Sequence, residues 1–233
     1  MATPTLSIVN GQVGLFSSRQ QLAAAGVYYV ATNATPGTAL NTGQISTYSA
    51  TADGFLTIVN NNPTGSGVNI YPDYLKCMMS GTAPAGTTVM NFNLVTDAVA
   101  GVTPTAGNVA LSAINVNRGS TNSSNSIINV STGAAAMTIP AATGAAKNVG
   151  RAQIPTSLGI TGDVYVLDFG GQQVDIGGQG GGTAVRATAP ARLSDCTVPV
   201  IIPPQTGLIV NMWWLGSITN KPFFEYEIGL VEV

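Results

Sequence analysis

Short runs of alternating apolar and polar residues, separated by loops rich in Gly, Pro and Asn, make up most of this chain. In the last run, the apolar residues at every second position from Phe224 to Leu230 alternate with Glu225 and Glu227. A period of two is typical of a strand that buries one face. The period of about 3.6 residues that marks a helix is nearly absent, and we expect one short helix, over 18–25. The pattern therefore predicts an all-β protein.

We expect about eight strands between residue 54 and the C-terminus, with turn-forming residues between them. Pro72 lies inside the second strand and indicates an edge position or a bulge. The alternation of the last strand slips near Gly229, which a bulge would explain. The long connections over 133–162 and 170–196 favour a jelly-roll or Greek-key β-sandwich over a meander. The expected strands are 55–59, 68–79, 88–95, 109–116, 127–130, 163–169, 197–202, 208–215 and the run from residue 224 onward.

The first 50 residues have a different character. The segment Leu6–Val13 contains Asn-Gly, the signature of a two-residue hairpin turn, and the stretch 31–43 is rich in Ala, Thr and Gly. We therefore expect an N-terminal arm or attachment segment over residues 1–50 and one jelly-roll β-sandwich domain over residues 51–233. A single all-β domain commonly reaches this size.

The charge and histidine content exclude several classes of function. Of the 233 residues, 10 are acidic, 8 are basic and none is histidine. Without an imidazole base, neither a Ser-His-Asp triad nor a Cys-His pair can be built, and zinc sites with histidine ligands are excluded. Eight scattered cations form no patch that neutralises a run of phosphates, so we expect no nucleic-acid partner.

The sequence gives no sign of a membrane segment or of export. No apolar stretch approaches the roughly 20 residues of a membrane helix, and the first residues lack the basic and apolar regions of an export signal. Cys77 and Cys196 are too few for a disulfide-stapled secreted scaffold. We therefore expect two reduced, free thiols and no membrane partner.

No group of residues makes a persuasive catalytic site. The glycine-rich segment 170–182 lacks the spacing of a dinucleotide-binding or phosphate-binding loop. Asp163 and Asp168 differ by five positions and therefore point to opposite faces of a strand. Glu225 and Glu227 lie about 7 Å apart on one face, which a glycosidase pair permits, but a solvated strand face is the simpler interpretation. We expect a protein that is not an enzyme, with no catalytic residue, no cofactor and no metal.

Two adjacent tryptophans point to opposite faces of one expected strand. Trp214 shares its face with apolar residues and is expected in the core, as are Phe92, Tyr226 and Ile228. Three roles stay open for Trp213, namely a subunit contact, packing under a loop and stacking on a sugar.

Three sequence motifs occur together in the second part of the chain. The strand FLTIVNN at 55–61 leads into NIYPDYLK at 69–76, the run GNVALSAINVN occupies 107–117, and the end combines VPVIIPPQTGL at 198–208 with the tryptophan pair and FEYEIG at 224–229. This set, over about residues 50–233, resembles the jelly-roll decoration, or cement, proteins of tailed-bacteriophage capsids. The resemblance implies a virion structural protein that binds the phage head as a homotrimer, with the major capsid protein as its partner, and does no chemistry. It also implies a location on the capsid surface after assembly in the bacterial host cytoplasm.

The composition agrees with that expectation, because low charge lowers the cost of desolvating large interfaces between subunits. One alternative stays open: a tail-associated or lectin-like receptor-binding module of the same fold. A lectin needs an exposed aromatic side chain beside polar groups in a cleft, and Trp213 and some of the tyrosines qualify.

Overall fold

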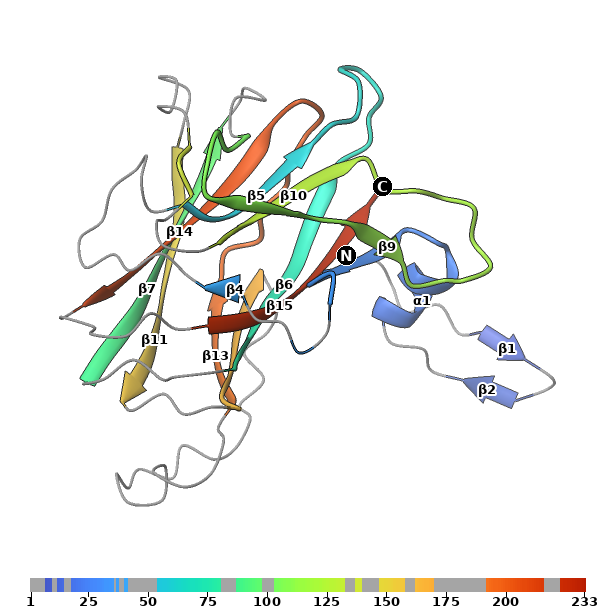
Figure 1. The fold of residues 1–233 in the computed structure, drawn as a ribbon. Helices are drawn as coiled ribbons and strands as arrows, with labels where there is room; N and C mark the ends of the chain where they lie inside the picture. Colours follow the sequence, from blue (N-terminus) through green and yellow to red (C-terminus); the bar gives the residue numbers. More distant parts are fainter. Residues whose placement is uncertain are drawn as a thin grey trace.

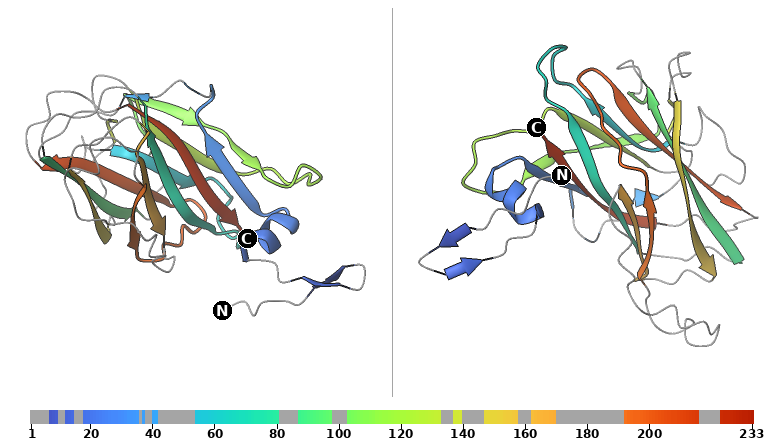
Figure 2. Two further views of the ribbon diagram at one scale, coloured as in Figure 1. Left: turned by 90° about the horizontal axis from the view of Figure 1, so that it is seen from below. Right: turned by 180° about the vertical axis from the view of Figure 1, so that it is seen from behind.

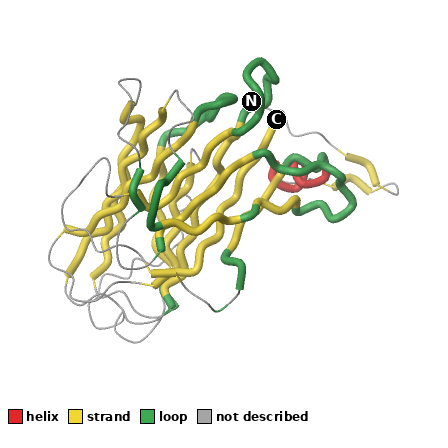
Figure 3. Tube along the Cα trace, turned by 45° about the horizontal axis from the view of Figure 1, so that its top comes forward, coloured by secondary structure: helices red, strands yellow, loops and turns green. Residues whose placement is uncertain are grey.

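Strands dominate the part of the chain that the computed structural model describes, and α1 (Ser18–Ala24) is the only helix in it (Figure 3). The described residues are 7–9, 12–14, 18–35, 37, 40–41, 54–80, 87–97, 103–132, 137–139, 147–157, 162–169, 192–215 and 223–233. The strands are β1 (Ser7–Val9), β2 (Gln12–Gly14), β3 (Tyr28–Thr32), β4 (Leu40–Asn41), β5 (Gly54–Asn60), β6 (Ile70–Met79), β7 (Thr87–Asp97), β8 (Asn108–Leu111), β9 (Ala113–Asn115), β10 (Ser126–Ser131), β11 (Lys147–Ser157), β12 (Val164–Phe169), β13 (Arg192–Thr197), β14 (Gly207–Leu215) and β15 (Phe223–Glu232).

Two sheets face each other as a β-sandwich (Figure 1). One sheet has the strand order β11-β7-β14-β5-β10-β8, and the other has the order β13-β12-β6-β15-β3-β9, with β4 also paired to β15. The pairs are antiparallel except for the parallel pair β12–β13. The predicted all-β sandwich is confirmed.

The pairing of eight of these strands is that of a jelly roll. In chain order the eight are β3, β5, β6, β7, β11, β12, β14 and β15. The first pairs with the last, the second with the seventh, the third with the sixth and the fourth with the fifth. This nesting folds one antiparallel ribbon into two facing sheets. The jelly-roll topology expected from the long crossings is therefore present.

The jelly roll begins before residue 51. Its first strand, β3, pairs with β15 on one side and with β9 on the other. The segment 1–50, expected as an arm, thus supplies β3 and β4 to the sandwich. Ahead of it, β1 and β2 form a sheet of their own, in which Val9 pairs with Gln12. That register confirms the predicted two-residue hairpin.

The predicted short helix, α1, ends against the polar loop that follows β9 (Figure 1, Figure 2). The side-chain amides of Asn115 and Asn122 donate to the carbonyl oxygen of Gly26, at 2.8 and 3.0 Å, and that of Asn117 donates to Ala24 at 3.2 Å. The carbonyl group of Ala24 lies in the last turn of α1, where carbonyl groups have no partner within the helix. Asn117 provides that partner, and the bonds of Asn115 and Asn122 to Gly26 hold the end of α1 on the sandwich.

A chain of edge-to-face aromatic contacts links the two sheets through the core. Phe55 lies 6.2 Å from Phe92 and 5.4 Å from Tyr226, measured between ring centroids. Tyr226 continues to Phe224 at 6.4 Å, and Phe224 to Tyr165 at 5.8 Å. Such aromatic pairs add about 0.5–1.5 kcal/mol each beyond the area they bury.

Three of the four side chains predicted in the core are buried there. Phe92 is 2% exposed, Tyr226 1% and Ile228 0%. The side chain of Trp214 lies outside the described residues.

The two irregularities seen in the sequence belong to one β-bulge between β6 and β15. Gly229 pairs with Tyr74 and Leu230 pairs with Pro72, so Asp73 is the extra residue. The bulge predicted near Gly229 is confirmed, with the additional residue on the partner strand. Of the two alternatives for Pro72, the bulge is the correct one. Pro72 does not lie at a sheet edge, since β6 lies between β12 and β15.

The strand expected over 197–202 is wrong. β13 ends at Thr197, and in the segment that follows only Ile202 forms a β-bridge, to Ile70. Pro199 lies in that segment, and a proline cannot donate a hydrogen bond to a sheet ladder.

Two further strand expectations differ from the structure. The run 109–116 breaks at Ser112 into β8 and β9, which pair in different sheets. The connection over 133–162 contains β11, a strand we did not predict. Its sequence carries Lys147, Arg151 and Pro155, residues typical of an edge strand that avoids further pairing.

A second, smaller hydrophobic core lies on the outer face of the sheet that runs from β11 to β8. Val59, Val95 and Ile209 of that face pack with Met137 and Ile139, which reach the sheet through a bridge between residues 137 and 54. Part of what would be a solvated strand face is therefore buried.

Candidate functional site

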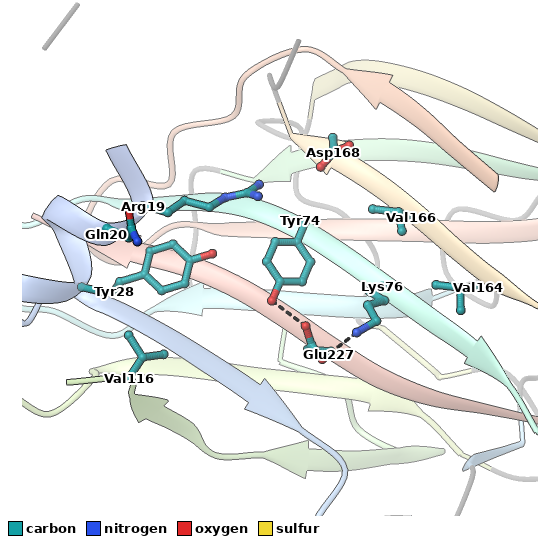
Figure 4. A pocket seen from close by; sticks show the side chains of 11 residues that line it. Arg19, Gln20, Tyr28, Tyr74, Lys76, Val116, Val164, Val166, Asp168 and Glu227 are labelled. Carbon is teal, nitrogen blue, oxygen red and sulfur yellow. Dashed lines mark hydrogen bonds and ion pairs between the residues drawn. The ribbon is translucent and has the colours of Figure 1, made fainter. Parts of the chain in front are cut away.

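An open groove of about 620 Å³ lies on the outer face of the other sheet, where α1 meets strands β12, β6, β15 and β3 (Figure 4). Its volume is within the range of small-molecule sites. The groove is lined by Arg19, Gln20, Ala23, Tyr28, Tyr74, Lys76, Val116, Val164, Val166, Asp168 and Glu227.

The bulged residue Asp73 anchors α1 at one end of the groove. Arg19 donates to both carboxylate oxygens of Asp73, from Nε at 2.6 Å and from Nη2 at 2.9 Å. The hydroxyl of Tyr28 donates to the same carboxylate. A two-point contact of this kind fixes the orientation of the guanidinium as well as its position.

A second polar group occupies the floor of the groove, next to Arg19. The hydroxyl of Tyr74 donates to Oε1 of Glu227 at 2.7 Å, and Nζ of Lys76 donates to Oε2 at 2.9 Å (Figure 4). The guanidinium carbon of Arg19 lies 5.5 Å from the centre of the Tyr74 ring, within cation–π range. The two groups therefore form one continuous polar floor.

The surroundings shift the pKa values of the titratable side chains in this floor. Burial, together with hydrogen bonding to Asp73, raises the pKa of Tyr28, and burial with hydrogen bonding to Glu227 raises that of Tyr74. Burial acts to raise the pKa of Glu227 as well, but hydrogen bonds from Tyr74 and Lys76 outweigh it and lower that pKa. At neutral pH Glu227 is a carboxylate and both phenols are neutral.

This charge state argues against acid–base chemistry at Glu227. A general acid needs a pKa raised toward the working pH, and the pKa of Glu227 is lowered. The carboxylate already accepts from both Tyr74 and Lys76, so it serves as an anchor for those side chains.

The carboxylates considered in the sequence have different surroundings. Glu225 accepts from the backbone N–H of Gly37 at 3.2 Å, and Glu227 lines the groove. Asp163 is buried just before β12 and accepts from the hydroxyl of Tyr165, whereas Asp168 lines the groove.

The tryptophans, the glycine-rich segment and the cysteines lie away from the groove or outside the described residues. Trp213 is half-buried on β14, opposite Asn91 of β7. Segment 170–182 is outside the described residues. Cys77 is a buried free thiol, and burial raises its pKa. The side chain of Cys196 is not among those described.

Sequence reasoning missed Arg19, Tyr28 and Tyr74 as site residues. The signal that was present is the pair of irregularities at Pro72 and Gly229, because the bulge between them turns Asp73 toward α1. The pairing of β3 with β15, which brings Tyr28 to the groove, had no local signal.

Among the described residues, no group of three or more Cys, Asp or Glu side chains is placed to hold a metal ion. The helix of the described part is too short to cross a membrane. No family model matches this chain, and neither a curated protein nor a solved structure shows significant similarity to it.

Proposed function

We propose that this chain is a non-enzymatic structural protein of a virion, a homotrimer that binds the major capsid protein on the surface of a tailed-phage head. The observation that carries the proposal is the presence of exposed aliphatic side chains on two separate surfaces of a jelly roll that is poor in charge. At one edge, β9 exposes Ile114 (57%). The second surface lies after β13, where the chain crosses toward the bridge between Ile202 and Ile70 of β6 and exposes Val198 (46%) and Ile201 (53%).

Two different apolar surfaces suit a ring of identical subunits. In a cyclic trimer each interface joins one surface of a subunit to a different surface of the next. Ile114 lies on β9, and Val198 and Ile201 lie in the segment after β13, so a contact between one surface of a copy and the other surface of the next leaves two surfaces free to close a ring. With 18 charged residues in 233, such contacts desolvate few ions.

The proposal places the protein on the capsid surface after assembly in the bacterial host cytoplasm. The buried, free thiol of Cys77 is compatible with that reducing compartment. The jelly roll is a fold of viral shell proteins and of lectins, and the first of these classes supports the proposal.

Native mass measurement of the purified protein tests the trimer. We expect a mass of about three times 23.6 kDa for the wild type and of one chain for Ile114→Asp and for Ile201→Asp. Val233→Asp, at an exposed aliphatic residue of the C-terminus, is the matched control and should remain trimeric.

Mixing Ile114→Asp with Ile201→Asp gives a sharper result. Each variant keeps one intact apolar surface, so an equimolar mixture should form heterodimers that cannot grow further. A monomeric wild type, or a mixture that stays monomeric although each variant is folded, would refute the ring arrangement.

Co-sedimentation with purified phage heads that lack this protein tests the second half of the proposal. We expect the full chain to sediment with the heads and a chain without residues 1–17, which keeps α1 and β3, to bind more weakly. A folded protein with no affinity for the heads would leave the receptor-binding alternative as the better account.

A further inference from the structure

We propose that the groove between α1 and the outer face of the β12–β6–β15–β3 sheet binds a short neutral saccharide. This goes beyond a role in the shell, and it does not depend on the trimer. The inference rests on the charge balance of the groove, on its fixed hydrogen-bonding groups and on its apolar walls.

The charge balance argues against an anionic ligand. Arg19 and Lys76 are the cations of the groove, but Asp73 holds the first and Glu227 the second. Asp168 and Glu227 are the carboxylates of the lining, and Asp73, bound to Arg19 at one end of the groove, is a third. Two cations against three carboxylates disfavour phosphate, sulfate and acidic sugars, since a like-charge contact costs binding energy.

The N–H donors of Arg19 and Lys76 that the anchoring carboxylates do not use can bond to the hydroxyl groups of a ligand. Arg19 has five N–H donors, of which its contacts with Asp73 use two, and Lys76 has three, of which one reaches Glu227. Both side chains are partly exposed. Their anchors hold them in place, so they offer donors without a large cost in side-chain entropy.

The walls of the groove are apolar. Ala23 of α1, Val116 and Val164 border it, and all three are at least partly exposed. A pyranose ring has C–H groups on its faces and hydroxyls around its rim. It can therefore lie against the aliphatic walls while its hydroxyls reach the charged groups on the floor.

A hydrophobic peptide fits the groove less well. It would bury the Tyr74–Glu227–Lys76 group without offering it new hydrogen bonds, and desolvating such groups without replacing their water contacts is unfavourable.

Titration of the full chain with a panel of free oligosaccharides, followed by saturation-transfer NMR and calorimetry, tests the proposal. The panel comprises neutral trisaccharides of glucose, galactose, mannose and N-acetylglucosamine, with a sulfated disaccharide as the anionic arm and a short Val-rich peptide as the third arm. We expect at least one neutral trisaccharide to bind and both other arms to be silent.

Two matched pairs of variants locate the binding. Ala23→Trp should fill the groove and weaken binding by at least about tenfold, whereas Ala24→Trp, at an exposed position of α1 that does not line the groove, should leave it unchanged. Lys76→Met should weaken binding by about tenfold through loss of a charged donor, and Lys147→Met on β11 should not.

Absence of binding to every neutral trisaccharide overturns the proposal, as does tighter binding of the sulfated sugar or of the peptide. Equal affinities of Ala23→Trp and Ala24→Trp would place any sugar site elsewhere and overturn it too. Circular dichroism of each variant separates loss of the site from loss of the fold.

Discussion

A β-carbon added to Gly229 would lie 2.4 Å from Cε1 of Tyr74, its partner across the β6–β15 ladder. It would also lie 2.6 Å from the hydroxyl oxygen of Tyr28. Glycine at this position therefore allows both tyrosines to lie flat against the sheet, with their hydroxyls on Asp73 and Glu227.

Gly229→Ala should destabilise the protein by about 1–3 kcal/mol, because both rings must move away from a close-packed position. The free energy of unfolding in urea measures this effect. Gly119→Ala is the control, since the nearest atom to its new β-carbon is 3.4 Å away, in the side chain of Asn117. Equal stability of the two variants would show that the tyrosines adjust freely.

Arg19→Ala should release α1 from the sandwich. The substitution removes the two-point contact with Asp73 and the cation–π contact with Tyr74, and we expect a loss of about 1 kcal/mol because the pair is partly exposed. Hydrogen exchange of the α1 amides should become faster while that of β5 and β14 stays slow. Arg118→Ala, at an exposed arginine in the nearby loop, should change neither.

Glu227 should make stability depend on pH at the acid end. Its folded-state pKa is lowered, so the folded protein favours the carboxylate, and its contribution is complete above the unfolded value of about 4.3. The contribution is lost as the pH falls below that value through the folded pKa. Glu227→Gln should flatten this part of the profile of unfolding free energy against pH.

Glu225→Gln is the matched loss of a negative charge on the same face of β15. If both variants change the acid limb to the same extent, the contacts with Tyr74 and Lys76 are not its cause.

Tyr226→Phe should leave stability unchanged or raise it slightly. The hydroxyl of Tyr226 is buried and has no hydrogen-bond partner in the part of the chain that the structure describes, so its removal ends a desolvation cost. Thermal unfolding measures the effect. Tyr165→Phe is the contrast, because the hydroxyl of Tyr165 donates to buried Asp163, and its loss should be destabilising.

Both cysteines should titrate as thiols in the denatured, unreduced protein, and Cys77 should be unreactive in the native state because it is buried. The register of the sheet supports this. Cys77 pairs with Tyr165 and Cys196 with Asp168, two strands away and three positions along, which separates their Cα atoms by about 14 Å. A disulfide needs about 7 Å or less. Finding no thiols would contradict this register.

Local pattern determined the class of fold. Alternation of apolar and polar residues along β7 and the first part of β15 predicts strands, and Gly, Pro and Asn between such runs predict the turns, because both effects depend on neighbouring residues alone. The hairpin at β1–β2 and the short helix α1 follow from turn and helix-end residues in the same way.

Only the tertiary structure decided which strands pair and which strand faces are covered. β3 belongs to the sandwich because it pairs with β15, which lies almost 200 residues later in the chain. Nothing within residues 28–32 specifies that partner. Asn91 and Asn93 alternate with apolar residues as a solvated face would, yet both are buried. Burial of a strand face depends on what the rest of the chain lays over it.

The groove, too, depends partly on local sequence and partly on the tertiary structure. The sequence marks Pro72 and Gly229 as irregular, but their meeting in one bulge needs the pairing of β6 with β15. Arg19, Asp73 and Glu227 are brought together from three distant segments by that pairing and by the docking of α1. Charge, burial and pKa in the groove are properties of this assembly, because each depends on distances between side chains that the order of residues along the chain does not set.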